Sequence, residues 1–137
     1  MATAFHGTAI GFVAGLLAGK ANNPIGLFVT ERADLAQRYA DAVASHEVST
    51  EVRRVKSSAV IELETEEVID WKRRADSHRT LDLCEATIKT WQIAHVTIYT
   101  TEYEIGHSVV RVDSKYIKIY PYLQERLGDR LEIVVIE

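Results

Sequence analysis

Residues 7–19 read GTAIGFVAGLLAG and hold four of the seven glycines in the chain, one at every fourth position. These glycines are Gly7, Gly11, Gly15 and Gly19. Residues four apart lie on one face of an α-helix, and a glycine inside a helix costs about 0.5–1 kcal/mol relative to alanine. The spacing therefore predicts one helix over residues 5–20, whose glycine face packs closely against a neighbouring helix.

The composition of the 137-residue chain is typical of one soluble globular domain, with 47% hydrophobic and 26% charged residues. A net charge of −4 argues against a sequence-blind nucleic-acid binder, but it allows a local basic surface. The apolar run at residues 9–18 is shorter than the roughly 20 residues that a membrane span needs, so no membrane partner is expected. With Cys84 as the single cysteine, no intrachain disulfide can form, and we expect the protein in the cytoplasm or within a viral assembly.

The segments after the glycine helix alternate between helix and strand patterns. Up to residue 75 we expect a strand at 25–30, a helix from Glu31 to about Ser45, a hairpin of 48–55 with 59–63, and a helix at 66–75. Further on we expect a helix at 81–91, a hairpin of 95–105 with 108–112, a strand at 116–120, a helix from Pro121 to Leu127, and a strand at 131–136. This pattern predicts an α+β fold with helices packed on a mixed or antiparallel sheet. It forms a single domain, 1–137, with a seam near 76–79 between lobes 1–76 and 80–137.

The predicted order of elements over residues 7–75 resembles half of a LAGLIDADG domain. The segment VAGLLAGK at residues 13–20 stands where the family motif lies, and an Asn-Asn-Pro turn follows at 22–24. The similarity is greatest to the non-catalytic LAGLIDADG-like domain of the WhiA transcription regulators, which implies DNA or a regulatory partner and a self-associating module. The catalytic acid of the family falls at Ala18 or Lys20 here, and neither side chain can ligate a metal. The resemblance therefore implies a non-catalytic protein, followed by a strand-rich half that does not repeat the pattern.

Seven cations between residues 53 and 79 form a candidate phosphate-binding face: Arg53, Arg54, Lys56, Lys72, Arg73, Arg74 and Arg79. Acidic residues interleave with them, so a solvated surface of mixed charge explains the same pattern.

Five of the six tyrosines lie between residues 99 and 122. Period-two spacing places Tyr99 with Tyr103, and Tyr116 with Tyr120, on shared strand faces. Such a row could stack bases, form a protein interface or belong to an ordinary half-buried sheet.

The strand at 131–136 is apolar on both faces, including Ile133 and Val135, which predicts a place inside a sheet or at an interface. We expect it to insert between strands of its own sheet, or to add to the sheet of a neighbouring copy.

Neither a catalytic constellation nor metal-ligand spacing is present among the histidines and Cys84, so we expect no enzyme activity, cofactor or metal. Two functions remain open. One is a non-catalytic, self-associating, DNA-binding or regulatory module. The other is a structural subunit of a homo-oligomeric assembly such as a viral particle.

Overall fold

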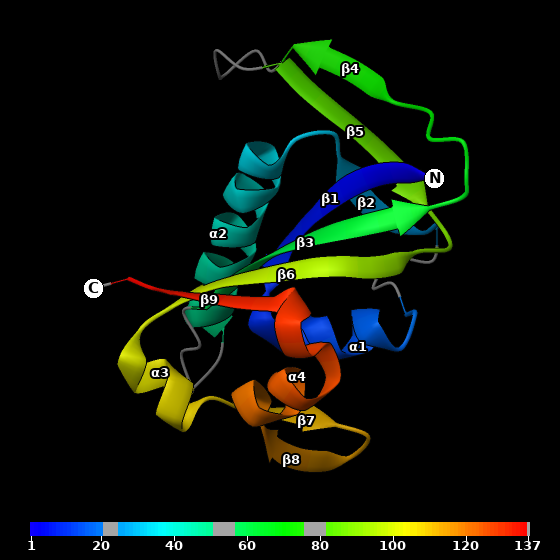
Figure 1. Cartoon of the computed structure of the whole chain (residues 1–137). Coiled ribbons are helices and arrows are strands. Elements are labelled where there is room, and N and C mark those ends of the chain that lie inside the picture. The colour runs from blue at the N-terminus through cyan, green and yellow to red at the C-terminus, as the bar shows by residue number, and fades with distance from the viewer. Residues whose placement is uncertain (21–24, 51–56, 76–81, 137) are drawn as a thin grey trace.

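The computed structural model describes residues 1–20, 25–50, 57–75 and 82–136, with side chains for all of these except 45–50, 73–75 and 82–84. Its α-helices, short 3-10 helices (η) and strands are, in chain order, β1 Ala2–Ala9, η1 Ile10–Phe12, α1 Val13–Leu17, β2 Leu27–Thr30, α2 Ala33–Thr50, β3 Ser58–Thr65, β4 Lys72–Ala75, β5 Asp82–Ile88, β6 Gln92–Thr100, α3 Glu102–His107, β7 Val109–Val112, β8 Lys115–Lys118, α4 Ile119–Leu127, η2 Gly128–Arg130 and β9 Leu131–Val135. Seven of the described strands form one sheet, in the order β4-β5-β2-β1-β3-β6-β9, and β7 pairs with β8 (Figure 1). The predicted α+β class is confirmed.

The sheet is antiparallel throughout except at its last pair, where β9 runs parallel to β6. Strand β1 lies in the middle and pairs with β3 without interruption, from Ala2↔Thr65 to Ala9↔Ser58. Its pairing with β2 is limited to Phe5↔Thr30. Beside that pair, Nδ1 of His6 lies 2.6 Å from the carbonyl oxygen of Phe28. The imidazole thus bridges the two strands where the backbone ladder is interrupted.

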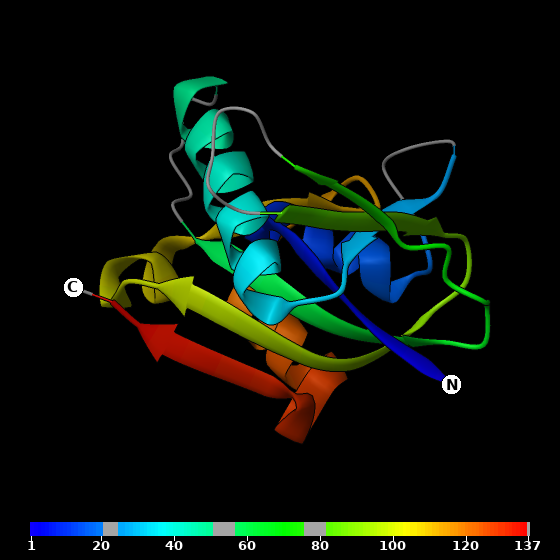
Figure 2. The ribbon, with the colours of Figure 1, turned by 90° about the horizontal axis from the view of Figure 1, so that it is seen from above.

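The two faces of the sheet are covered by different helices (Figures 1 and 2). On one face η1, α1 and α4 pack large aliphatic side chains against the strands, and this is the main core. Its fully buried members include Ile10 and Val13 next to α1, Ile61 on β3, and Leu123 on α4. On the other face α2 contacts β1 and β3 through small side chains, chiefly Ala36 and Ala40.

The glycine helix predicted for residues 5–20 is wrong, because the four glycines belong to four different backbone environments. Gly7 is in β1, Gly11 in η1, Gly15 in α1, and Gly19 follows α1 with a φ of +77°. A Cβ at Gly7 would lie 1.7 Å from the carbonyl oxygen of Ala36, so α2 contacts the β1 backbone directly there. Close packing at Gly7 is thus present, but it joins a helix to a strand.

Two further predicted helices, 66–75 and 81–91, are also wrong. Residues 72–75 form strand β4, no helix is present at 66–71, and most of 81–91 is strand β5. Ala86 and Ile88 of β5 are buried while Thr87 between them is exposed, which is the period of a strand. Trp91 lies outside any helix, just before β6.

The predicted hairpins are wrong in their pairing. Residues 48–50 are the end of α2, and 51–55 lie outside the described residues, while β3 pairs with β1 and β6. In the second predicted hairpin α3 follows β6, and β7 pairs with β8 through Asp113 and Ser114, which both have positive φ as in a type I′ turn.

Other local predictions are confirmed: β2, the start of α2, the 59–63 strand within β3, the helix that ends at Leu127 and the strand from Leu131. The predicted strand at 116–120 is correct only to Lys118, because α4 begins at Ile119. The LAGLIDADG-like order of elements is not confirmed, since the chain begins with a central strand in place of the long motif helix. The seam residues 76–79 lie outside the described part, and β4 and β5 on either side of them pair with each other.

Candidate functional site

Strand β9 occupies one edge of the sheet and is bonded on one side. Its register with β6 runs from Val96↔Leu131 to Thr100↔Val135, and the amide of Ile136 continues it by donating to the carbonyl of Thr100 at 2.7 Å. Successive residues of a strand direct their backbone groups to alternate sides. Since Ile136 points toward β6, the N–H and C=O groups of Leu131, Ile133 and Val135 point outward. No described strand pairs with that outer side.

The side chains of this edge are mostly apolar. Leu131 and Ile133 pack partly buried against the main core, whereas Val135 and Ile136 are 43% and 49% exposed. The one described acidic side chain of β9, Glu132, has its Oε1 3.9 Å from Nε2 of His95. The expected insertion of this strand between strands of its own sheet is wrong, because β9 joins the sheet at its edge. The edge therefore combines free backbone groups with exposed apolar surface.

The opposite edge of the sheet, β4, has a different composition. Among the described strands it pairs with β5 alone, and it reads Lys72-Arg73-Arg74-Ala75. Charged residues on an edge strand discourage pairing with another chain, whereas a flat apolar edge invites it. Of the two edges, β9 is the one that is open to strand addition.

The predicted phosphate-binding residues are only partly placed by the structure. Arg53, Arg54, Lys56 and Arg79 lie outside the described residues. Lys72 is exposed, and Arg73 and Arg74 follow it on β4. The basic face as a whole stays a prediction, with β4 as its described part.

The predicted rows of tyrosines are wrong, because two of the four residues lie in helices. Tyr99 is half-buried on β6 near α2, while Tyr103 is on α3, 72% exposed, and stacks on the ring of His107 at 4.3 Å between centroids. Tyr116 on β8 is 74% exposed, and Tyr120 on α4 is 4% exposed. No shared strand face joins them.

A buried cluster of polar side chains, unforeseen from the sequence, links the end of the sheet to α3 and α4. Ser57 Oγ donates to the Glu104 carboxylate at 2.5 Å and lies 2.6 Å from Thr100 Oγ1 and 2.8 Å from the hydroxyl of Tyr120. Tyr120 in turn donates to Thr100 at 2.7 Å. All four side chains are at most 7% exposed, and burial raises the pKa of the Tyr120 phenol. These buried hydrogen bonds join α3 and α4 to the end of the sheet.

In the described part of the chain, no three His, Cys, Asp or Glu side chains gather closely enough to hold a metal ion. None of the described helices has both the length and the apolar character that crossing a membrane requires.

No family model, curated protein or solved structure matches this chain.

Proposed function

We propose that the protein is a non-catalytic, self-associating module whose copies join through the outer side of β9. The observation that carries the proposal is the contrast between the two sheet edges: β4 is basic, while β9 presents unpaired backbone groups beside exposed Val135 and Ile136. Strand addition satisfies such backbone groups and buries such side chains.

A second copy of the same strand suits this edge. In an antiparallel pair around a two-fold axis at Ile133, that residue faces its own copy and Leu131 faces Val135 of the second copy. All outward backbone groups of β9 are then used in both chains. Each Glu132 lies opposite a valine, Val134 of the other copy, so that like charges do not meet directly. The product is one sheet that continues across the two copies.

The alternative assembly pairs unlike edges. The basic β4 edge of one copy and the β9 edge with Glu132 of the next carry opposite charges. Such head-to-tail contacts build a closed ring or an open filament, depending on the rotation between copies, and either is an assembly expected of a structural subunit.

The test is light scattering after size exclusion, over a range of protein concentrations, on the parent and on Val135→Pro. Proline removes an outward N–H and leaves the N–H of Ile136 bonded to Thr100. We expect a dimer for the parent and a folded monomer for Val135→Pro, whose melting temperature is lower only by the concentration-dependent contribution of dimerisation. The matched control Val135→Ala keeps the N–H and should retain most of the dimer.

A monomeric parent, or a Val135→Pro variant that dimerises like the parent, would overturn the proposal. Rings or filaments larger than a dimer, which charge reversal at Lys72 disperses, would favour the head-to-tail assembly instead.

DNA binding is a second candidate function, supported by the Lys72-Arg73-Arg74 run on β4. The logarithm of the affinity of Lys and Arg for phosphate falls linearly with the logarithm of the salt concentration, with a slope of about one unit for each phosphate that a side chain neutralises. Charge reversal at Lys72 and Arg73 should reduce affinity for duplex DNA and lower that slope. Absence of parental binding at low salt would dismiss this function without affecting the β9 proposal.

A further inference from the structure

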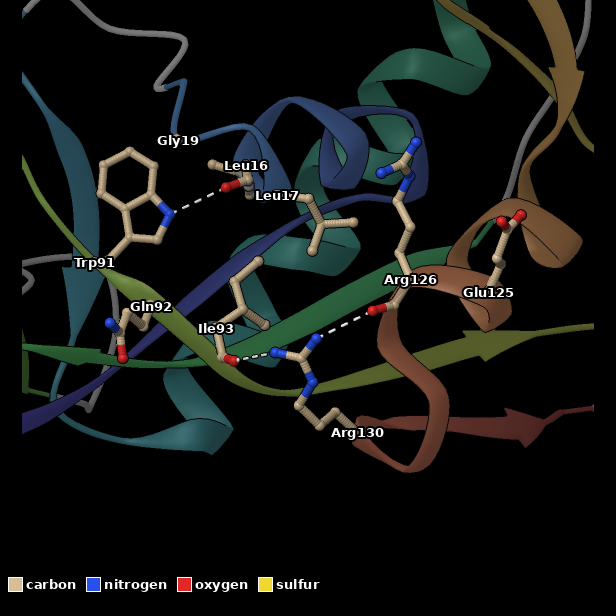
Figure 3. Close-up of a pocket in the computed structure, with 9 residues that line it drawn as sticks. All are labelled: Leu16, Leu17, Gly19, Trp91, Gln92, Ile93, Glu125, Arg126 and Arg130. Carbon is tan, nitrogen blue, oxygen red and sulfur yellow. Dashed lines mark hydrogen bonds between the residues drawn. The ribbon is translucent and has the colours of Figure 1, made fainter.

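A cleft of about 700 Å³ opens on the α1/α4 side of the molecule, and of the candidate site residues predicted from the sequence only Gly19 lines it (Figure 3). Its walls come from three separate segments: α1 with Leu16 and Leu17, the start of β6 with Trp91 and Ile93, and α4 with the following turn. That volume falls in the range of small-molecule sites, roughly 300–1,000 Å³.

Hydrogen bonds between the segments hold the walls of this cleft in place. The indole N–H of Trp91 donates to the carbonyl of Leu16 at 3.1 Å, which ties β6 to α1. The guanidinium of Arg130 donates to the carbonyl of Ile93 at 2.9 Å and to that of Arg126 at 3.1 Å, which ties β6 to α4 (Figure 3). A site whose walls are preorganised in this way loses little conformational entropy when a ligand binds.

The charge of the cleft favours an anion. The guanidinium of Arg130 bonds to backbone carbonyls, and no carboxylate of the described residues lies within salt-bridge distance of it. The guanidinium of Arg126 stacks 4.3 Å above the ring of Tyr122, and none of its N–H groups bonds to a described protein atom. Glu125 also lines the cleft, at the end away from Trp91, but it forms no ion pair with either arginine (Figure 3). The N–H groups of the planar Arg126 guanidinium therefore remain available to bind a carboxylate or a phosphate.

The opposite wall is apolar and includes an aromatic ring. Leu17, Trp91 and Ile93 lie across the cleft from Arg126, and all belong to or pack against the main core (Figure 3). A ligand that spans the cleft would place a flat apolar group beside Trp91 and a negative charge beside Arg126.

We propose that this cleft is a binding site for a small organic anion that carries an aromatic ring, with Arg126 as the anion-binding residue and Trp91 as the ring contact. The site is separate from the β9 edge and does not depend on self-association. The anion can be a phosphate or a carboxylate, and two probes distinguish these: adenosine monophosphate and indole-3-acetate.

The experiment follows Trp91 fluorescence in a Trp71→Phe background while adenosine monophosphate is added, and it uses calorimetry for indole-3-acetate, whose indole ring fluoresces as Trp91 does. Adenosine, which lacks the charge, and inorganic phosphate, which lacks the ring, serve as matched ligand controls. We expect at least one charged aromatic probe to bind at least tenfold more tightly than either control, and more weakly as salt is raised.

Arg126→Gln should lower the affinity for that probe at least tenfold without changing the melting temperature, because its side chain is exposed and its guanidinium, which lies over the Tyr122 ring, makes no hydrogen bond to a described protein atom. Arg111→Gln removes an equally exposed arginine on β7, outside the cleft, and should leave the affinity unchanged. The proposal is overturned if neither probe binds at millimolar concentration, if the probe that binds is held no more tightly than adenosine and inorganic phosphate, or if the two arginine variants behave alike.

Discussion

The two faces of the central sheet are packed in different ways. Against α1 and α4 the strands present large aliphatic side chains, such as Ile61 and Ile98, which are fully buried. Against α2 the contact is made by Gly7, Ala36 and Ala40, so that the backbones of helix and strand nearly touch. Side-chain volume thus sets the spacing of the layers: a thick hydrophobic layer on one face, and direct backbone contact on the other.

This difference predicts opposite sensitivities on the two faces. On the α2 face there is no room for a methyl group added at Gly7. On the α1/α4 face, a shorter side chain would leave a cavity.

Gly7→Ala should have the largest effect on stability. Its Cβ would lie 1.7 Å from the oxygen of Ala36 and 2.7 Å from the nitrogen of Ala40, both backbone atoms that cannot move without shifting α2. We expect the free energy of unfolding to fall by about 3 kcal/mol or more, at or above the upper end of ordinary overpacking. Urea denaturation measures this directly.

Two controls sharpen that result. Gly15→Ala adds the same methyl group inside α1, where nothing lies within 4 Å of the new Cβ, and should be neutral or stabilising by up to about 1 kcal/mol. Ile61→Val removes one methyl from the opposite face and should cost about 0.5–1.5 kcal/mol. If Gly7→Ala proves no worse than Ile61→Val, the two faces do not differ as described.

Tyr120→Phe tests the polar cluster that reinforces the α1/α4 face. The change removes the hydroxyl that bonds to Ser57 and Thr100 and leaves buried oxygen atoms with fewer partners. We expect a loss of about 1–2 kcal/mol in the free energy of unfolding. Tyr116→Phe, at a residue that is 74% exposed, should change it by less than about 0.5 kcal/mol. Equal effects of the two variants would show that the cluster contributes nothing to stability.

The smallest predicted effect is a pH dependence that arises at His6, between β1 and β2. Burial lowers the pKa of this imidazole below its ordinary value of 6.5, despite the bond to Phe28, which acts the other way. Below pH 6.5 the unfolded chain therefore binds this proton more readily than the folded one. The contribution of His6 to stability is complete above that pH and declines as the pH falls through the folded-state pKa.

Denaturation curves at about pH 7, about pH 6 and about pH 5 should reveal the decline. His6→Gln keeps a hydrogen-bond donor but does not titrate, so it should reduce the pH dependence of the free energy of unfolding. His107→Gln, on the exposed side of α3, should not reduce it. A parent and a His6→Gln variant with parallel pH profiles would contradict the assignment.

Neither the cleft nor the polar cluster can be predicted from the sequence, because each joins segments that are far apart along the chain. The local spacing assigns Trp91 to a helical stripe with Leu81 and Ile88, and Arg126 and Arg130 carry no local signal. Their roles depend on the meeting of α1, β6 and α4, which no local spacing encodes. The β9 edge is easier to predict from the sequence. Ile133 and Val135 belong to a strand that is apolar on both faces, and this pattern already indicates an interface.

Local sequence signals were sufficient for a few elements: β2, the acidic start of α2, the end of α4 at Gly128, and β9. Tertiary contacts, in contrast, make residues 2–9 and 82–88 strands, place β9 parallel to β6 at an edge, and bring Gly7 against α2. The physical reason lies in the hydrogen bonds. A helix satisfies its backbone groups within a few residues, whereas a strand depends on partners supplied by distant parts of the chain.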